Sequence, residues 1–293
     1  MISIITSTRN SFLQKKGSLE LMLKSLKKQA GLEDYELIVV DNGSNDDSID
    51  FLESFKRDAP FQSMKIIKND VDVSNRSRSR NIACQQADGD FFLFIDDDVI
   101  LPDKNILSKV RRFAKEGFFA TGASRCWTYI NWRREVLLEK IEKEDWPKES
   151  QYYFLPMGIK RETGYRDLFE YSFIGNFGLV DRKNFFHVGG FDEKTFDGWG
   201  REDVDLMLRL YLDKIKFRLL FDDIWIIHLN HSLRRSDAKQ RSKSFEKYKK
   251  RESELGFVFK VNHLYGVFEN DGTAILEPLN SGDSLIKKDL AVH

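Results

Sequence analysis

Three consecutive aspartates follow an apolar run in the first half of the chain. Residues 91–95 read FFLFI, and Asp96, Asp97 and Asp98 come directly after them. Like charges repel and burial of a carboxylate is costly, so a cluster at the end of a buried strand needs a compensating partner. A hard divalent cation bound by carboxylate oxygens would supply it. The spacing predicts a metal site with Asp96 and Asp98 turned to one side and Asp97 pointing elsewhere; the alternative is a solvated acidic turn.

A second acidic pair lies far along the chain, in the segment GWGREDVD at 198–205. Glu202 and Asp203 are expected to open a helix, whose N-terminal dipole stabilises carboxylates. A carboxylate held there can accept a proton from a hydroxyl group. Gly200 allows close approach of a ligand, and Trp199 offers a flat apolar face on which a ring can stack. The alternative is a simple helix cap beside a core tryptophan.

Two of the five histidines follow a late apolar run, IWIIH, at positions 228 and 231. A neutral imidazole is a good ligand for Mn²⁺. We favour His228 as the ligand because it directly ends the predicted strand, and His231 is the rival. A structural role is the alternative for both.

The elements that must position these residues alternate between strand and helix. Apolar runs typical of buried strands lie at 2–6, 35–41, 64–69 and 90–95, with helix-like periodicity at 18–31, 46–60 and 74–89 between them. This order predicts an α/β fold with a Rossmann-like, mostly parallel central sheet flanked by helices. Ligands of such sheets bind at the carboxyl ends of the strands. The polar residues expected at that edge, besides the aspartate triplet, are Thr6, Thr8, Arg9, Asp41, Asn42, Ser44, Asn69 and Asp70.

The composition is that of an ordinary globular chain of 293 residues, of which 41% are hydrophobic. The 47 basic and 47 acidic residues balance, so no overall field favours nucleic acid as a partner. Cys84 and Cys126 match no disulfide or metal spacing. No apolar stretch approaches the roughly 20 residues of a membrane span. These features predict a cytoplasmic protein without a transmembrane segment, which could sit peripherally at the inner face of the membrane.

The second half of the chain is less regular. Residues 118–170 are expected to form an irregular, aromatic insertion over the cleft, and strand and helix patterns return after it. From Ser232 the chain becomes basic and helical, and the residues from Phe257 onward carry weak signals. We expect this tail to wrap the domain or contact a partner.

Taken in order, several segments resemble the family 2 glycosyltransferases of the A-type (GT-A) fold. They are ISIITSTRN, ELIVVDNGSNDDS and RSRNIACQQADGDFFLFIDDD, and the segment at 198–206 is similar to the Gly-Trp-Gly-x-Glu-Asp segment of galactosyltransferases. The resemblance spans roughly residues 1–232. It implies a GT-A domain at 1–232, with a nucleotide-binding half at 1–117 and an acceptor-binding half at 118–232. Residues 233–293 would form a C-terminal helical extension and tail.

The resemblance also implies an activity and roles for single residues. It implies a Mn²⁺- or Mg²⁺-dependent, inverting transfer of a hexose or N-acetylhexosamine from a UDP-sugar to a carbohydrate hydroxyl, in surface polysaccharide or glycoconjugate synthesis. The residues that would bind donor, metal and acceptor or act as base are Thr6, Thr8, Asp41, Arg80, Asp96, Asp97, Asp98, Asn176, Trp199, Gly200, Glu202, Asp203, His228 and His231. Arg80 would face the nucleotide or its phosphates, whereas Arg76 and Arg78 are expected to face water.

Three other activities stay open at this point. A retaining transferase carries a related Gly-Trp-Gly-x-Glu segment, and the anomeric configuration of the product would distinguish it. A nucleotidyltransferase shares the sheet and acidic site, but the chain lacks a glycine-rich phosphate loop after its first strand. A catalytically silent binding subunit would have no need of the aspartates, the Glu-Asp pair and His228 together. The donor sugar, acceptor, linkage and oligomeric state are left undetermined.

Overall fold

The fold is described from a computed structural model. The described residues are 1–12, 16–69, 75–121, 124–128, 132–146, 175–220, 224–230, 235–255, 264–268 and 274–278. The strands are β1 (Ile2–Thr8), β2 (Tyr35–Asp41), β3 (Ser63–Lys68), β4 (Phe91–Ile95), β5 (Val99–Ile100), β6 (Phe118–Thr121), β7 (Ser124–Trp127), β8 (Phe177–Asp181), β9 (Lys216–Leu219), β10 (Trp225–His228), β11 (Leu264–Phe268) and β12 (Ala274–Pro278). The helices are α1 (Ser18–Lys27), the short 3₁₀ helix η1 (Leu32–Asp34), α2 (Ser48–Arg57), α3 (Arg76–Gln86), α4 (Ile106–Phe113), α5 (Arg134–Lys143), α7 (Arg182–His187), α8 (Glu202–Leu212) and α9 (Arg235–Glu254).

The described strands form one large sheet and one small sheet. The large sheet has nine strands in the order β11-β12-β9-β6-β8-β4-β1-β2-β3, and the small one has three in the order β5-β10-β7. Strands β4, β1, β2 and β3 are parallel, whereas β8 runs antiparallel to both β4 and β6. The predicted α/β fold, with a parallel, helix-flanked sheet at its centre, is confirmed.

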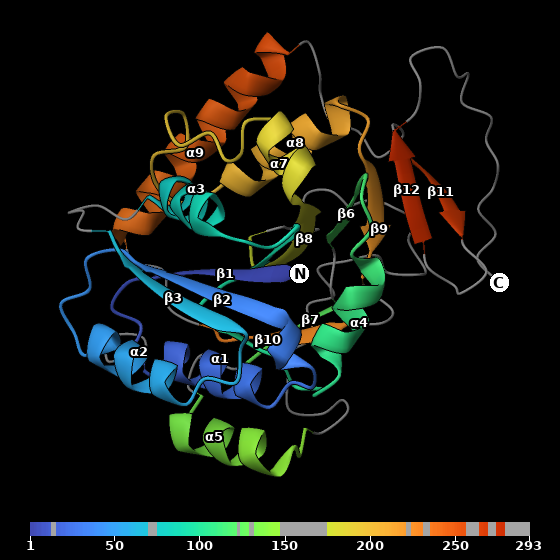
Figure 1. The fold of residues 1–293 in the computed structure, drawn as a ribbon. Coiled ribbons are helices and arrows are strands. Elements are labelled where there is room, and N and C mark those ends of the chain that lie inside the picture. The colour runs from blue at the N-terminus through green and yellow to red at the C-terminus, as the bar shows by residue number, and fades with distance from the viewer. Residues whose placement is uncertain are drawn as a thin grey trace.

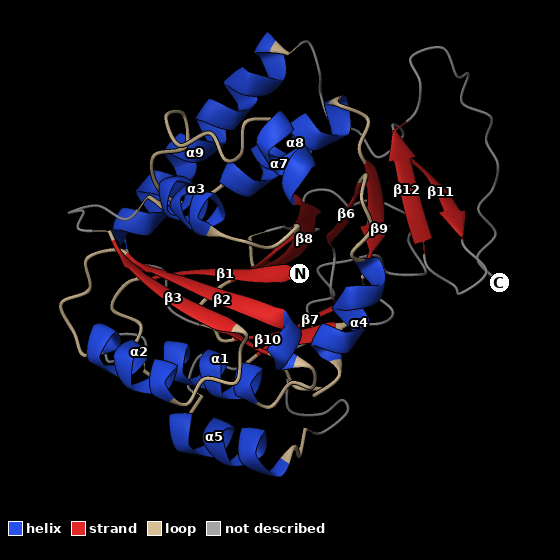
Figure 2. Ribbon diagram, in the orientation of Figure 1, coloured by secondary structure: helices blue, strands red, loops and turns tan. Residues whose placement is uncertain are grey.

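Helices cover both faces of the large sheet (Figure 1). Helices α1 and α2 lie on one face with α5 outside α1, and α3, α7, α8 and α9 lie on the other. Figure 2 shows the strands as a layer between these helices. Alternate side chains of one strand point to opposite faces, so both faces of β1 and β2 are apolar. Ile4 packs with the α1 side of the core and Ile5 with the α3 side.

The second half of the chain is more regular than its sequence indicated. The predicted irregular insertion at 118–170 contains β6, β7 and α5, and this part of the prediction is wrong. Residues 129–131 and 147–174, which include most of the aromatic side chains expected over the cleft, lie outside the described residues. The tail supplies α9, as its basic helical pattern predicted, and also β11 and β12, which extend the sheet from β9. Among the helices that the structure describes, none is long and apolar enough to cross a membrane.

Candidate active site

The parallel strands end at one edge of the sheet, as the sequence predicted. Thr8 at the end of β1 is in register with Asp41 at the end of β2, and Asp41 is in register with Lys68 of β3. Strand β4 pairs with the other side of β1 and ends at Ile95. The aspartate triplet therefore begins at the same edge as Thr8 and Asp41.

The three aspartates point to three different partners. Asp97 accepts a hydrogen bond of 2.8 Å from the Thr8 hydroxyl and another from the Ser11 hydroxyl. Asp96 faces α3, and Asp98 faces β10. The like charges of the triplet are thereby separated. Asp97, which was expected to point away from Asp96 and Asp98, is hydrogen-bonded to Thr8 of β1.

Asp98 and His228 meet where the small sheet begins. Val99 of β5 is in register with His228 of β10, and the backbone N–H of Leu229 donates to the carbonyl of Asp98 at 2.8 Å. This pairing brings Asp98 Oδ1 within 3.4 Å of His228 Nε2, and both side chains are less than 10% exposed. Two ligands of one divalent ion, each bound at about 2.1 Å, lie about 3 Å apart. The pair therefore fits Mn²⁺ or Mg²⁺.

The remaining predicted metal ligands lie differently. Asp96 belongs to the neighbouring arginine cluster, and His231 lies outside the described residues. Among the residues that the structure describes, no three His, Cys, Asp or Glu side chains gather closely enough to hold a metal. Asp98 and His228 would supply two ligands, and a bound ion would need further oxygens from elsewhere.

Arg80 of α3 connects the aspartate triplet to the acidic pair of α8. Its guanidinium donates to Asp96 Oδ1 at 2.9 Å, to Glu202 Oε1 at 3.0 Å and to the Gly175 carbonyl at 3.0 Å. The Arg80 side chain is only 3% exposed. These hydrogen bonds fix the residue after β4 relative to the first turn of α8. Asn176, which was predicted to contact the donor, follows Gly175 and is half-buried.

Arg76 lies one turn before Arg80 and also turns into the site. Its guanidinium is 3.8 Å from Asp96 Oδ2 and lies over the Trp199 ring, 5.7 Å from the ring centroid. The prediction that Arg76 faces water is wrong, whereas Arg78 is exposed as expected. A run of charges on one helix usually marks a solvent-exposed face. The prediction failed because Trp199, from a distant part of the chain, packs against Arg76.

Thr6 and Asp41 have local partners at the sheet edge. The Thr6 hydroxyl donates to the Ile95 carbonyl at 3.0 Å and so ties β1 to the end of β4. The Asp41 carboxylate accepts from the Ser44 backbone N–H at 2.9 Å and from the Ser44 hydroxyl. Asp41 is thus held in place in the turn after β2.

The first turn of α8 holds two carboxylates in unlike surroundings. Glu202 accepts from Arg80 and, at 2.9 Å, from the backbone N–H of Gly200. Asp203 accepts a hydrogen bond from the backbone N–H of Val204 at 3.0 Å. Burial, and then the charge of Glu202, raise the pKa of Asp203 well above its ordinary value. A raised pKa makes a carboxylate a stronger base.

The chain reaches α8 through a left-handed turn. Gly200 has a φ of 101° and Arg201 a φ of 71°, a region that a residue with a side chain seldom adopts. The turn leaves Trp199 half-buried, with Arg76 over its ring. It also lets the Gly200 N–H reach Glu202. Gly200 is therefore required for this turn, beyond the close ligand approach expected from the sequence.

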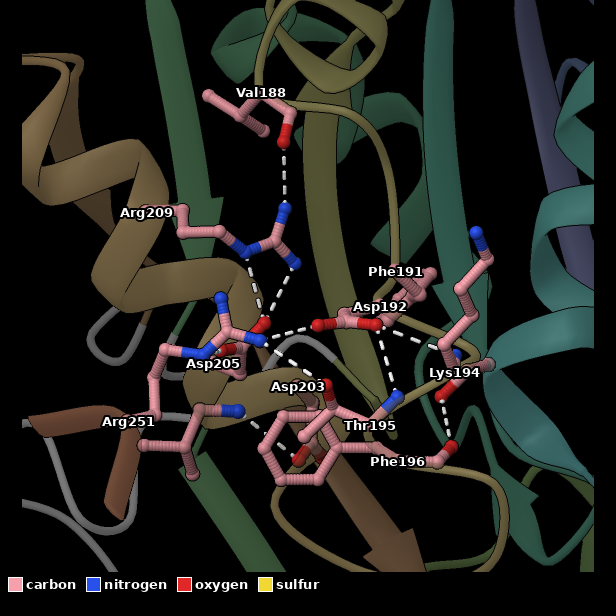
Figure 3. A network of polar contacts seen from close by, with 12 residues as sticks. Val188, Phe191, Asp192, Lys194, Thr195, Phe196, Asp203, Asp205, Arg209 and Arg251 are labelled. Carbon is pink, nitrogen blue, oxygen red and sulfur yellow. Dashed lines mark hydrogen bonds and ion pairs between the residues drawn. The ribbon is translucent and has the colours of Figure 1, made fainter. Parts of the chain in front are cut away.

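Behind this turn a polar network joins α8 to α9 (Figure 3). Asp205 is fully buried and is bound by Arg209 at 2.7 Å and by Arg251 of α9 at 3.6 Å. Arg251 also pairs with Asp192 and donates to the Thr195 hydroxyl at 3.2 Å. Sequence reasoning missed this network, because nothing local links Arg251 to residues that lie 46 to 59 positions earlier. Within α8, the four-residue spacing of Asp205 and Arg209 is the one local signal of an internal ion pair.

Comparisons with known protein families agree with the order of these segments. Residues 3–183 match the family model described as glycosyl transferase family 2, and residues 158–232 match the model described as the N-terminal domain of galactosyltransferase. The first match covers more than half of the chain.

Curated relatives carry glycosyltransferase names. An uncharacterised glycosyltransferase of Bacillus subtilis, YfnE, is 28% identical over 249 residues, which cover 71% of this chain and 60% of the relative. The poly(ribitol-phosphate) β-N-acetylglucosaminyltransferase TarS of Staphylococcus aureus is 28% identical over 114 residues, 39% of this chain and 19% of TarS. The chain therefore spans less than two thirds of the length of these relatives.

Solved structures share the fold. TarS residues 1–349 in complex with UDP-GlcNAc align with a TM-score of 0.61 and 19% identity, over 89% of this chain and 68% of that one. A mannosyltransferase of Pyrobaculum calidifontis, in complex with GDP-mannose and Mn²⁺, aligns with a TM-score of 0.57 and 13% identity, over 88% and 65% of the two chains. At these identities the likeness establishes the fold, which is the GT-A fold expected from the sequence.

Proposed function

The chain belongs to glycosyl transferase family 2, and from this premise we propose that it transfers a hexose or N-acetylhexosamine from a UDP-sugar to a carbohydrate hydroxyl with inversion. The observation that carries the proposal is the Arg80 contact between Asp96 and Glu202. It joins an acidic cation site at the strand ends to a buried carboxylate pair on α8. A transferase needs these two parts side by side, one for the leaving group and one for the attacking hydroxyl.

The donor would lie along the strand ends. Asp98 and His228 would hold Mn²⁺ or Mg²⁺, which when bound would neutralise charge on the diphosphate. The diphosphate oxygens would complete the coordination that two protein ligands leave incomplete. Asp41, fixed by Ser44, would accept a hydrogen bond from the base, which favours uracil, and Thr6, Thr8 and Asp97 would shape the pocket floor.

The acceptor would lie over the turn before α8. Asp203 would take the proton of the acceptor hydroxyl as that oxygen attacks the anomeric carbon, and its raised pKa makes it a competent base. Glu202, already held by Arg80 and Gly200, would position substrate hydroxyls. Arg76 lies over one face of the Trp199 ring. A sugar ring would stack on the other face, or on the same face if Arg76 moved away. Asn176 would contact the donor sugar.

The setting we propose is synthesis of a surface polysaccharide or glycoconjugate. It is supported by relatives named as poly(ribitol-phosphate) glycosyltransferases, and by a structural neighbour solved with UDP-GlcNAc. The donor sugar and the linkage would follow from the shape of the pocket.

A donor screen tests the proposal. The protein is incubated with MnCl₂, a mixture of carbohydrate acceptors and a panel of UDP- and GDP-sugars, and release of the nucleoside diphosphate is measured. We expect release of UDP from one class of UDP-sugar, and loss of the signal with EDTA. The anomeric configuration of the product, determined by NMR, distinguishes inversion from retention. Absence of release from every donor, or exchange of pyrophosphate with a nucleoside triphosphate, would contradict a glycosyltransferase.

A further inference from the structure

We infer that the acceptor is an anionic glycan, whose repeating phosphate or carboxylate groups bind a row of lysines on α9 beside the acceptor site. The row consists of Lys239, Lys243 and Lys247 and is called the lysine row below. This inference rests on the proposed function, because it takes the turn at Trp199 to be the place where acceptor binds.

Helix α9 lies directly against the segment that presents Trp199. The Ser244 hydroxyl donates to the Trp199 carbonyl at 3.0 Å, and Lys247 Nζ lies 2.6 Å from Asp197 Oδ1. A Cβ atom at Gly198 would meet the Gln240 side chain at 1.4 Å, so Gln240 occupies the space beside Gly198. Residues 197–199 therefore run along the middle of α9, and the lysine row borders the same stretch of helix.

The lysine row is spaced at four residues, which places its members on one side of a helix at intervals of about 6 Å. Lys239 and Lys243 are exposed, and within the described part of the chain neither forms an ion pair. Lys247 is bound to Asp197, whose pKa is lowered first by that hydrogen bond, with a smaller contribution from Lys243. Lys239 and Lys243 are thus available for a ligand. Lys247 neutralises the charge of the adjoining carboxylate of Asp197.

Exposure to solvent explains why a helix carries charged residues. It does not explain why one helix carries more positive than negative residues. Helix α9 carries eight Arg or Lys and four Asp or Glu residues, in a chain whose formal charge is zero. The outer helix α5 provides a comparison, since its ten residues include three of each sign. The excess on α9 therefore lies next to the acceptor segment, where it raises the local concentration of an anionic ligand.

The residue type also indicates a repeating ligand. Lysine is a flexible point charge with no preferred geometry, whereas arginine suits one fixed, two-pronged anion. A row of lysines suits a polymer that must slide past the site between additions. Arg76, over the Trp199 ring, adds a further positive charge beside the segment that α9 contacts.

Binding of labelled glycans tests the inference. Fluorescence anisotropy is measured with the full chain and three fluorescein-labelled decamers, which are a glycerol-phosphate chain, an oligogalacturonate and a neutral maltodextrin. We expect the phosphate or the uronate chain to bind, and its affinity to fall at least about tenfold between 50 and 300 mM NaCl. Binding of only one of the two supports the inference and identifies the anion.

Charge reversal locates the contact. Lys239→Glu/Lys243→Glu should weaken binding of the anionic decamer by about tenfold or more. The control Lys104→Glu/Lys143→Glu makes the same change in net charge near α5, where both lysines are more than half exposed, and should weaken it less than about threefold. Thermal unfolding verifies that both variants are folded. Equal losses in the two variants, or equally tight binding of maltodextrin, would overturn the inference.

The two proposals fail in different ways. If nucleotide release occurs with a neutral acceptor while no anionic decamer binds, the transferase stands and the anionic acceptor is excluded. If the decamer binds at α9 but no nucleotide sugar is turned over, the anionic surface stands and the transferase is excluded.

Discussion

Glu202 and Asp203 are neighbours in sequence, yet their surroundings assign them different chemistry. Glu202 accepts hydrogen bonds from a guanidinium and from a backbone N–H, which hold it in place. Asp203 is buried beside that negative charge, and its pKa rises. A buried carboxylate whose pKa is raised is a candidate for proton exchange with substrate. This supports the proposal that Asp203 is the base.

Replacement of Asp203 by Asn should lower turnover by about 10²- to 10⁴-fold, the contribution of a positioned base. The amide keeps the shape of the side chain but cannot take the proton. Binding of UDP, measured by calorimetry, should stay near wild type, because Asp203 lies on the acceptor side. Near-normal turnover with saturating acceptor would identify Asp203 as a helix cap and make Glu202 the next candidate.

Ionisation of Asp203 should determine how turnover falls at low pH. Asp203 must be ionised to act, so activity should fall as the pH drops through its raised pKa, well above the ordinary value of about 4. Glu202→Gln removes one cause of that rise and should move the limb to lower pH, whatever it does to the maximal rate. A limb that stays in place in Glu202→Gln would assign it to another group.

Ionisation of Asp203, which should raise activity, should lower the stability of the folded protein. A folded-state pKa above the unfolded value means that wild-type stability decreases as the pH rises between the two values. Asp203→Asn carries no such charge, so it should unfold at a higher temperature than wild type at pH 7. The difference should shrink as the pH falls and vanish about one unit below pH 4, where both states of the wild-type protein hold the proton.

The contact between Asp98 and His228 predicts that metal and nucleotide bind together. Titration calorimetry should show UDP binding weakened sharply by EDTA, by Asp98→Ala and by His228→Ala, because each removes a part of the same centre. The exposed His187, which pairs with Asp213 on the surface, provides the control His187→Ala. Equal UDP affinity with and without Mn²⁺ would exclude the site.

Helix α9 is tied to α8 and to the segment before it by Arg251, which contacts Asp192, Thr195 and Asp205. Arg251→Ala would leave the buried Asp205 with Arg209 alone and should lower the free energy of unfolding by about 1.5–3 kcal/mol. Turnover should fall with it, because Asp203 is on the same turn of α8 as Asp205. Lys250→Ala, an exposed neighbour paired only with Glu254, is the matched control for thermal unfolding and activity.

The elements that sequence predicted well are those fixed by local pattern. Strands β1 to β4 follow from nearly continuous apolar runs, in which neighbours such as Ile4 and Ile5 are both buried, and α3 begins after its N-cap Asn75, whose side chain accepts from the N–H of Arg78. The joining of β5 to β10 and the insertion of β8 beside β4 depend on pairing across long separations. The roles of Arg76 and Arg251 were missed for the same reason, since their partners lie about 120 and 50 residues away.

The two predicted halves of the domain are interleaved in space. Strand β8, from the second half, lies between β4 and β6, and Phe92 and Phe94 of β4 pack edge-on against Phe185 and Phe191. A fragment of residues 1–117 would expose these rings. We therefore expect the fragment to lack the sharp thermal transition of the full chain, measured by circular dichroism. A cooperative transition in the fragment would show that the nucleotide-binding half folds alone.

The contacts of α9 with residues 192–205 have a consequence for exchanging parts between related enzymes. A chimera that received only the segment around Trp199 would lose the partners that Ser244, Lys247 and Arg251 provide from the end of the chain. The acceptor segment and α9 should therefore be inherited together, and acceptor preference should transfer only when both come from the same parent. Within this family, the C-terminal helix would change in step with the substrate that the enzyme modifies.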